Sequence, residues 1–392
     1  MKRSYNYITA TILIFFVYIS MGIPDSIFGV AWPAMHVDFG LPVGYAGIVI
    51  AIISVLAGIS SIAQVPLARH LSTGTITYIS CVLTAVGLIG YSFCQNLATL
   101  VIYSIPLGLG AGGVDTTMSN YVSKYHSARY MNYLYGFAGI GSTIGPLMYS
   151  LSLKSGYTWR FTSGVIGAIQ LLLAVILVIY RSKWRSGDAD TPDNVQVQQK
   201  IGVFDLSSYL RIVLFFILTG AEVALGLWAS SALIEIKGVT DEVAAIALSM
   251  YFASVTLSRF VSGYLTTKLG NKMIIRGGLI LALAGTLLII IFDFWVLTIL
   301  GFMALGFGHS PIYPCLMHDT HRIYEESYAN RIVSYQIGAS LFGSIVVPSI
   351  MGLFMERLGL SYFFIYIAVF IALVAFIYFY LNVGLPINKK SI

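Results

Sequence analysis

Charged residues are scarce in this chain of 392 residues, where they make up 10% against 58% for apolar residues. A soluble globular domain carries about 25% charged residues, so a surface that lies mostly in water is excluded. The net charge of +6 does not indicate a nucleic-acid partner, because the 22 Lys and Arg residues are scattered between apolar runs and form no basic patch. The composition predicts a polytopic membrane protein in contact with a lipid bilayer.

Cysteine and histidine are sparse as well. The three cysteines show neither metal-ligand spacing nor a disulfide framework, and the six histidines form no HExxH or comparable pattern. A membrane enzyme would usually show a cluster of metal ligands or an activated nucleophile. We therefore expect no enzymatic activity, no metal site and no cofactor.

Twelve apolar stretches of about 20 residues are each long enough to cross a bilayer as a helix. The longest polar interruption, 181–205, divides them into six plus six. We therefore expect an all-α membrane protein with an N-terminal six-helix bundle over 1–180, a cytoplasmic linker over 181–207 and a C-terminal six-helix bundle over 208–392. The predicted spans lie near 7–31, 43–68, 75–94, 97–120, 133–152, 160–180, 208–230, 241–266, 272–292, 295–317, 332–354 and 361–382.

The distribution of positive charge predicts the orientation of these spans. With the amino terminus in the cytoplasm, 17 of the Lys and Arg residues fall on the cytoplasmic side and four on the opposite side. Cytoplasmic loops carry an excess of Lys and Arg, so both termini are predicted to be cytoplasmic. We expect a multi-pass protein of the cell membrane, meaning the inner or plasma membrane, that functions as a monomer.

The two halves of the chain match each other at a nearly constant offset. The segment 65–72 aligns with 263–270 at an offset of 198, and Pro146 aligns with Pro348 at 202. Two pseudo-symmetric six-helix halves, related by an axis along the membrane normal, are typical of transporters that bind their substrate between the halves. A channel would not need this duplication.

Three acidic residues lie well inside the predicted spans: Asp25 in span 1, Asp115 in span 4 and Glu222 in span 7. An ionisable side chain inside a span is costly and is by default a functional candidate. A carboxyl group that is neutral when occluded and ionised when open to water can carry a proton across. The alternative is that these carboxyl groups only form hydrogen bonds between helices.

Aromatic and polar residues near these acids are candidates for substrate binding. Asp25, Phe28 and Trp32 share one helix face, and an acid beside aromatic rings is a common arrangement for binding a sugar. Trp228 is the corresponding candidate in the second half, although both tryptophans fit equally well in the interfacial aromatic belt. Further candidates, each of which could instead bond helices together, are Asn120, His309, Tyr313 and Gln336.

Other residues of the spans have simpler explanations. Gly108 and Gly112 have the small-xxx-small spacing that allows close helix packing. Pro311 and Pro314 predict a break in span 10. Arg259 in span 8 is expected to reach toward the membrane surface or to pair with an acid.

Several motifs resemble the fucose–galactose–proton symporter family of the major facilitator superfamily. The similarity runs over nearly the whole chain and is carried by the glycine-rich run 108–115 ending in Asp115, by 131–146, by 222–228 and by 306–314. The resemblance implies a sugar–proton symporter with one membrane acid in span 1 and one in span 4. These fall on Asp25 and Asp115, of which one acts in proton coupling and the other in substrate recognition.

The chain also departs from that family. The loop motif Gly-x-x-x-Asp-Arg-x-Gly after span 2 is degenerate, with Val65, Arg69, His70 and Ser72 at its key positions. The asparagine that usually follows the span-4 acid by four residues is replaced by serine, and Asn120 comes one residue later.

The sequence therefore predicts a twelve-helix secondary transporter that imports a monosaccharide with protons by alternating access, without a nucleic-acid partner. The alternative is a proton-coupled exporter of drugs or amphipathic metabolites. A sensor or scaffold that transports nothing would give no reason for acids inside spans 1, 4 and 7.

Overall fold

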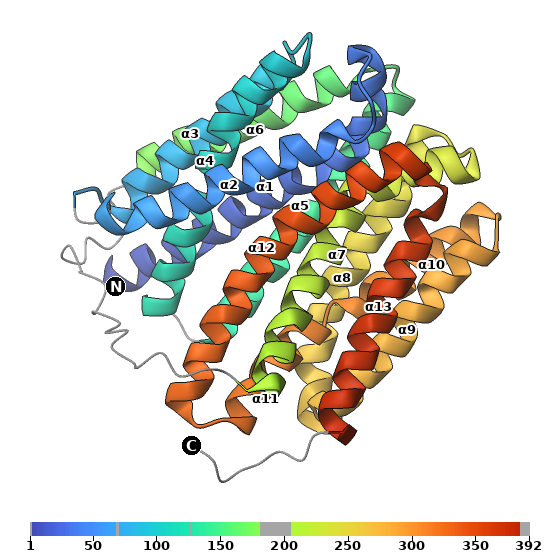
Figure 1. Ribbon diagram of the computed structural model, residues 1–392. Coiled ribbons are helices and arrows are strands. Elements are labelled where there is room, and N and C mark those ends of the chain that lie inside the picture. Colours follow the sequence, from blue (N-terminus) through green and yellow to red (C-terminus); the bar gives the residue numbers. More distant parts are fainter. Residues whose placement is uncertain (1, 68–69, 126–127, 181–204, 385–392) are drawn as a thin grey trace. The chain divides into compact units, whose positions relative to one another are not determined.

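The protein is described by a computed structural model over residues 2–67, 70–125, 128–180 and 205–384, and these ranges are almost entirely helical (Figure 1). The chain divides into two compact units, Met1–Gln199 and Lys200–Ile392. Most of the predicted linker, 181–204, lies outside the described residues.

Each unit contains helices long enough to cross a membrane, and the second unit also contains shorter ones. The first unit contains α1 (Lys2–Phe39), α2 (Tyr45–Leu67), α3 (Thr73–Tyr91), α4 (Leu97–Tyr125), α5 (Ala128–Lys154) and α6 (Trp159–Tyr180). The second contains α7 (Leu206–Lys237), α8 (Asp241–Leu269), α9 (Asn271–Ile291), α10 (Trp295–His309), α11 (Ile312–Ile323), α12 (Glu326–Leu358), the short 3-10 helix η2 (Leu360–Tyr362), α13 (Phe363–Phe379) and the π-helical turn η3 (Tyr380–Gly384).

The predicted twelve-span fold is confirmed. In the part of the chain that the structure describes, eleven segments have the length and apolar composition of a membrane span. The twelfth predicted span, near 133–152, falls within α5, a helix of 27 residues. One of the eleven segments, Trp295–Thr320, runs through both α10 and α11.

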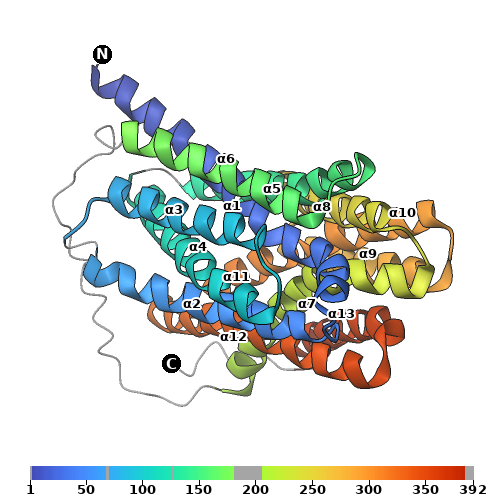
Figure 2. The ribbon, with the colours of Figure 1, turned by 90° about the horizontal axis from the view of Figure 1, so that it is seen from above.

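The helices pack in the same order in both units. In the first unit α1 packs on α5, α4 packs on α2 and α3, and α3 packs on α6. In the second unit α7 packs on α12, α10 packs on α8 and α9, and α9 packs on α13. Figure 2 shows the close pairs α3–α4 and α9–α10. The repeat detected in the sequence is therefore a repeat of structure.

Glycines allow the closest of these contacts. A Cβ atom on Gly141 of α5 would overlap the carbonyl oxygen of Ile19 in α1, and one on Gly343 of α12 would overlap that of Phe216 in α7. The predicted close packing of span 4 is also present, since a Cβ atom on Gly112 would overlap the carbonyl oxygen of Ala57 in α2.

Span 10 is broken at its prolines, as predicted. The helix α10 ends at His309 and α11 begins at Ile312. Pro311 has no N–H to donate to the carbonyl oxygen of Phe307. The hydroxyl of Ser258 in α8 donates to that oxygen instead, at 2.6 Å, so the break leaves this backbone group satisfied.

We expect Gly112→Ala to destabilise the protein by about 1–3 kcal/mol, because the added methyl group forces α2 and α4 apart. The measurement is the thermal unfolding midpoint of the purified protein in detergent. Gly58→Ala is the matched control, since a Cβ atom on Gly58 meets nothing within 4 Å, and it should be neutral or stabilising by up to about 1 kcal/mol. Equal midpoints for the two variants would contradict the close α2–α4 contact.

Candidate functional site

Asp25 is an exposed acid among buried neighbours. It lies in the middle of α1, where Ile23, Ser26 and Ile27 are all buried. The face of α1 that carries Asp25 is therefore accessible at Asp25 itself, because Tyr18 and Trp32 on the same face are buried. Ionisable residues inside membrane spans face either protein or a water-filled space, so this face is a candidate lining of the transport path.

Asp115 of α4 is half-buried and is held by a tyrosine of α1. The hydroxyl of Tyr18 donates a hydrogen bond to Oδ1 of Asp115 at 3.0 Å and lies 3.3 Å from the backbone oxygen of the same residue. Tyr18 precedes Asp25 by seven residues, which is two helical turns and about 10 Å along α1. The same face of α1 therefore supplies one acid and the hydrogen-bond donor of the other.

The two carboxyl groups lie close enough for their charges to act on each other. The structure thus brings together the predicted acids Asp25 and Asp115. Sequence reasoning missed Tyr18, although its spacing from Asp25 was a usable signal. The spacing along α1 does not predict where α4 crosses α1, and this crossing determines that Tyr18 meets Asp115.

The aromatic candidates are packed inside their own units. Phe28 and Trp32 stack at 5.5 Å between ring centroids and are 5% and 0% exposed. The indole N–H of Trp32 donates to the carbonyl oxygen of Val43 at 2.7 Å, and that of Trp228, also 0% exposed, donates to the carbonyl oxygen of Pro348 at 3.1 Å. In this conformation no face of either indole ring is open to a ligand.

The second unit contains an ion pair within its spans. Oε1 of Glu222 in α7 lies 3.6 Å from Nη2 of Arg259 in α8, and the two side chains are 30% and 34% exposed. Of the two expectations for Arg259, pairing with an acid is the one observed. Both members of the pair remain accessible, so the pair is a candidate polar site on the second unit.

Two buried polar groups lie under the influence of this pair. The charges of Glu222 and Arg259 act on Tyr251 of α8 and on His309 of α10. The hydroxyl of Tyr251 is buried without a hydrogen-bond partner, and the buried ring of His309 lies beside the backbone of Leu218. Buried polar groups normally have a partner, so this region is suited to bind water or a ligand hydroxyl group.

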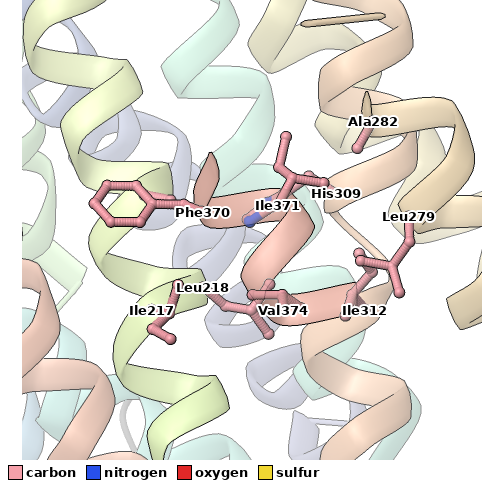
Figure 3. A pocket seen from close by; sticks show the side chains of 10 residues that line it. Ile217, Leu218, Leu279, Ala282, His309, Ile312, Phe370, Ile371 and Val374 are labelled. Atoms are coloured by element: carbon pink, nitrogen blue, oxygen red, sulfur yellow. The ribbon is translucent and has the colours of Figure 1, made fainter. Parts of the chain in front are cut away.

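A small pocket lies beside the His309 ring (Figure 3). Apolar side chains, among them Leu218, Leu279, Ile312 and Ile371, form most of its lining. Its volume is about 10 Å³, which is the space of roughly one water molecule. The pocket itself is therefore too small for a sugar ring.

The remaining candidates lie near the break in span 10. Tyr313 of α11 is half-buried; its ring packs edge-on against Phe215 at 4.6 Å, and its hydroxyl accepts a hydrogen bond from Ser340 at 3.4 Å. Gln336 of α12 is fully buried and donates to the hydroxyl of Thr320 at 3.0 Å. The side chain of Asn120 lies outside the described residues.

Within the ranges that the structure describes, no group of three or more His, Cys, Asp or Glu side chains is placed to hold a metal ion. The carboxyl groups of Asp25, Asp115 and Glu222 can exchange protons, and the accessible polar side chains can form hydrogen bonds to a polar solute.

Comparisons with known proteins assign the fold. A sequence profile of the Major Facilitator Superfamily matches residues 14–230 and again 211–391. An uncharacterised transporter of this type from Yersinia pestis is 23% identical over 271 residues, which cover 66% of this chain and 67% of that protein. The glucose transporter GlcP from Staphylococcus epidermidis is 24% identical over 155 residues, which cover 38% of this chain and 35% of that protein.

Solved structures show the same fold. The crystal structure of a bacterial homologue of the human lysosomal transporter Spinster, inward-facing and occupied, matches with a TM-score of 0.79 at 14% identity over 97% of each chain. The nucleoside transporter NupG, solved as a mutant, matches with a TM-score of 0.74 at 14% identity over 94% of this chain and 98% of that chain.

We expect Glu222 and Arg259 to be energetically coupled. Glu222→Gln and Arg259→Gln should each destabilise the protein, and the double variant should lose less than the sum, with a coupling energy of about 0.5–3 kcal/mol. The measurement is a double-mutant cycle on thermal stability in detergent.

Glu235 provides the control for this cycle. It lies 13 residues after Glu222 on α7, about 20 Å along the helix, so Glu235→Gln and Arg259→Gln should be additive within about 0.5 kcal/mol. Additivity of Glu222→Gln and Arg259→Gln would mean that the pair contributes nothing to the fold.

Proposed function

Because the chain belongs to the major facilitator superfamily, we propose that it is a secondary transporter that carries a monosaccharide together with protons by alternating access. The two six-helix units would be the two halves that rock about a central substrate site. The protein would be a cell-membrane monomer with both termini in the cytoplasm, as the charge distribution predicts.

The observation that supports proton coupling is the pair of acids in the first unit. Asp25 is exposed in the middle of α1, and Asp115 is half-buried and hydrogen-bonded to Tyr18. Acids within membrane spans are typical of proton relays in transporters. An accessible carboxyl group can exchange its proton with water on one side of the membrane and, after the units move, with water on the other.

The proposal of a monosaccharide substrate rests on the accessible polar side chains and on the sequence similarity to one known transporter. Asp25, Asp115 and Glu222 offer carboxylates, and Tyr313 offers a hydroxyl, all of which can bond to sugar hydroxyl groups. The partial similarity to a glucose transporter favours the same substrate class. Because Phe28, Trp32 and Trp228 are buried, their contribution to sugar binding would require a conformation in which they are exposed.

We expect a monosaccharide to acidify the interior of proteoliposomes that contain this protein. Hexoses, deoxyhexoses and pentoses are added singly without an imposed gradient, and internal pH is followed with a trapped dye. One or a few sugars should carry protons inward down the sugar gradient. Empty liposomes provide the control for sugar leak and for osmotic artefacts.

A flat response across the whole panel, from protein shown to be folded, would overturn sugar–proton symport. The same vesicles then test the alternative function. Efflux of an amphipathic fluorescent compound, driven by an imposed proton gradient, would show a proton-coupled exporter.

We expect Asp115→Asn to separate transport from proton coupling. The variant should lose proton-linked uptake of the active sugar by at least about tenfold, because the amide cannot exchange a proton, and should retain sugar counterflow exchange. Loss of both activities would make Asp115 a recognition residue instead. Normal proton-linked uptake by both Asp25→Asn and Asp115→Asn would contradict the role of the acids altogether.

A further inference from the structure

We infer that Tyr18 is a positioning residue for Asp115: its hydroxyl orients the carboxyl group and favours the ionised form of that group. The inference rests on the proposed function, because it gives Asp115 the role of the proton-exchanging acid. The contact that carries it is the 3.0 Å hydrogen bond from the Tyr18 hydroxyl to Oδ1 of Asp115.

The Tyr18 ring is held firmly enough to act in this way. Its side chain is 2% exposed, and it belongs to a packed cluster that includes Val114 and Met118 on either side of Asp115 in sequence. Tyr135 of α5 packs edge-on against the ring, with 6.1 Å between centroids. The hydroxyl is therefore fixed in place before any proton is exchanged, which is the condition for a directional effect on a neighbouring group.

In the second unit, the residues that correspond to Tyr18 and Asp115 are Phe215 and Tyr313, so no acid is present there. Phe215 of α7 follows Tyr18 by 197 residues, and Tyr313 follows Asp115 by 198. Both spacings agree within one residue with the offset of 198 between 65–72 and 263–270. These two residues also contact each other, through an edge-on packing of rings at 4.6 Å. Phe215 is 0% exposed, so a phenylalanine fills this position with its ring fully buried.

This comparison separates packing from hydrogen bonding. The contact between the first and fourth spans of a unit can be made by an aromatic ring alone, as Phe215 demonstrates. In the first unit, Tyr18 carries a hydroxyl and faces the acid Asp115. In the second unit, Phe215 carries no hydroxyl and faces Tyr313, which is not an acid. The hydroxyl of Tyr18 is therefore assigned to Asp115, whose carboxyl oxygen at 3.0 Å is a nearer acceptor than its backbone oxygen at 3.3 Å.

Other groups near Asp115 bear on how it exchanges a proton. The helix α2 carries no charged side chain. Asp25 of α1 acts on Asp115 through its charge, and Tyr18 of α1 bonds to it directly. The other titratable groups in or against the cluster that holds Tyr18 are Cys81 and Tyr78 of α3, Tyr121 of α4 and Tyr135 of α5.

The test is the variant Tyr18→Phe, read by infrared spectroscopy on purified protein without a substrate. The stretch of a protonated carboxyl group is followed as pH is lowered, and the part of the signal that is missing in Asp115→Asn is assigned to Asp115. A hydrogen bond favours the ionised form that accepts it. We expect its loss to move protonation of Asp115 to higher pH by about 1 to 2 units.

Tyr91→Phe is the matched control. Tyr91 is also a buried phenol of the first unit, and its hydroxyl bonds with that of Ser104 at 2.7 Å, so the variant removes a similar hydrogen bond that involves no acid. It should leave the Asp115 signal where it is. Tyr18→Phe in the Asp115→Asn background should leave the remaining carboxyl signal unchanged.

The outcomes distinguish this inference from the proposed function. An Asp115 signal that titrates at the same pH in Tyr18→Phe and in the unchanged protein would overturn the role of Tyr18. A signal that moves equally in Tyr91→Phe would also overturn it. Neither result affects the proposed function, which fails on a separate observation: no sugar of the panel acidifies proteoliposomes that contain the folded protein.

Discussion

The lipid interior offers no hydrogen-bond partner, so every polar group inside a span must find one within the protein or in water held by the protein. This constraint accounts for the helical fold and for most of the side-chain contacts in the spans. Ser258 takes the carbonyl oxygen that Pro311 leaves open, and Tyr18 donates to Asp115. One of the exceptions is informative: the Tyr251 hydroxyl has no partner although the charges of Glu222 and Arg259 act on it, so water or a polar solute is the remaining source of its hydrogen bond.

The two units form equivalent helix contacts at corresponding positions of the internal repeat. Gly141 and Gly343 allow equivalent close contacts. Asp38 and Glu235, 197 residues apart, each join the end of the first helix of a unit to the start of the last. Asp38 accepts from Trp159 at 2.8 Å, and Glu235 accepts from the backbone N–H of Leu360 at 3.3 Å. These contacts favour units that move as rigid bodies, which alternating access requires.

Much of this could be predicted from the sequence, because it depends on local features. Span lengths, the break at Pro311, the close contact at Gly112 and the acids of spans 1, 4 and 7 follow from residue type and spacing. Burial of a particular helix face does not. Asp25 and Trp32 share a face of α1, yet Asp25 is exposed and Trp32 is buried against the segment that contains Val43. That difference, like the partner of Tyr18, depends on where other helices cross α1.

The two units differ in what surrounds their acids, and this difference indicates where a proton is carried. Glu222 faces the cation of Arg259 at 3.6 Å, and protonating it would remove the attraction between these two opposite charges within the spans. Asp115 accepts from a neutral phenol, so its protonation strands no charge on that partner. The carboxyl groups of Asp25 and Asp115 also lie close enough to act on each other as like charges. We therefore expect the first unit to exchange the proton, while Glu222 and Arg259 remain charged and act on the substrate or on the fold.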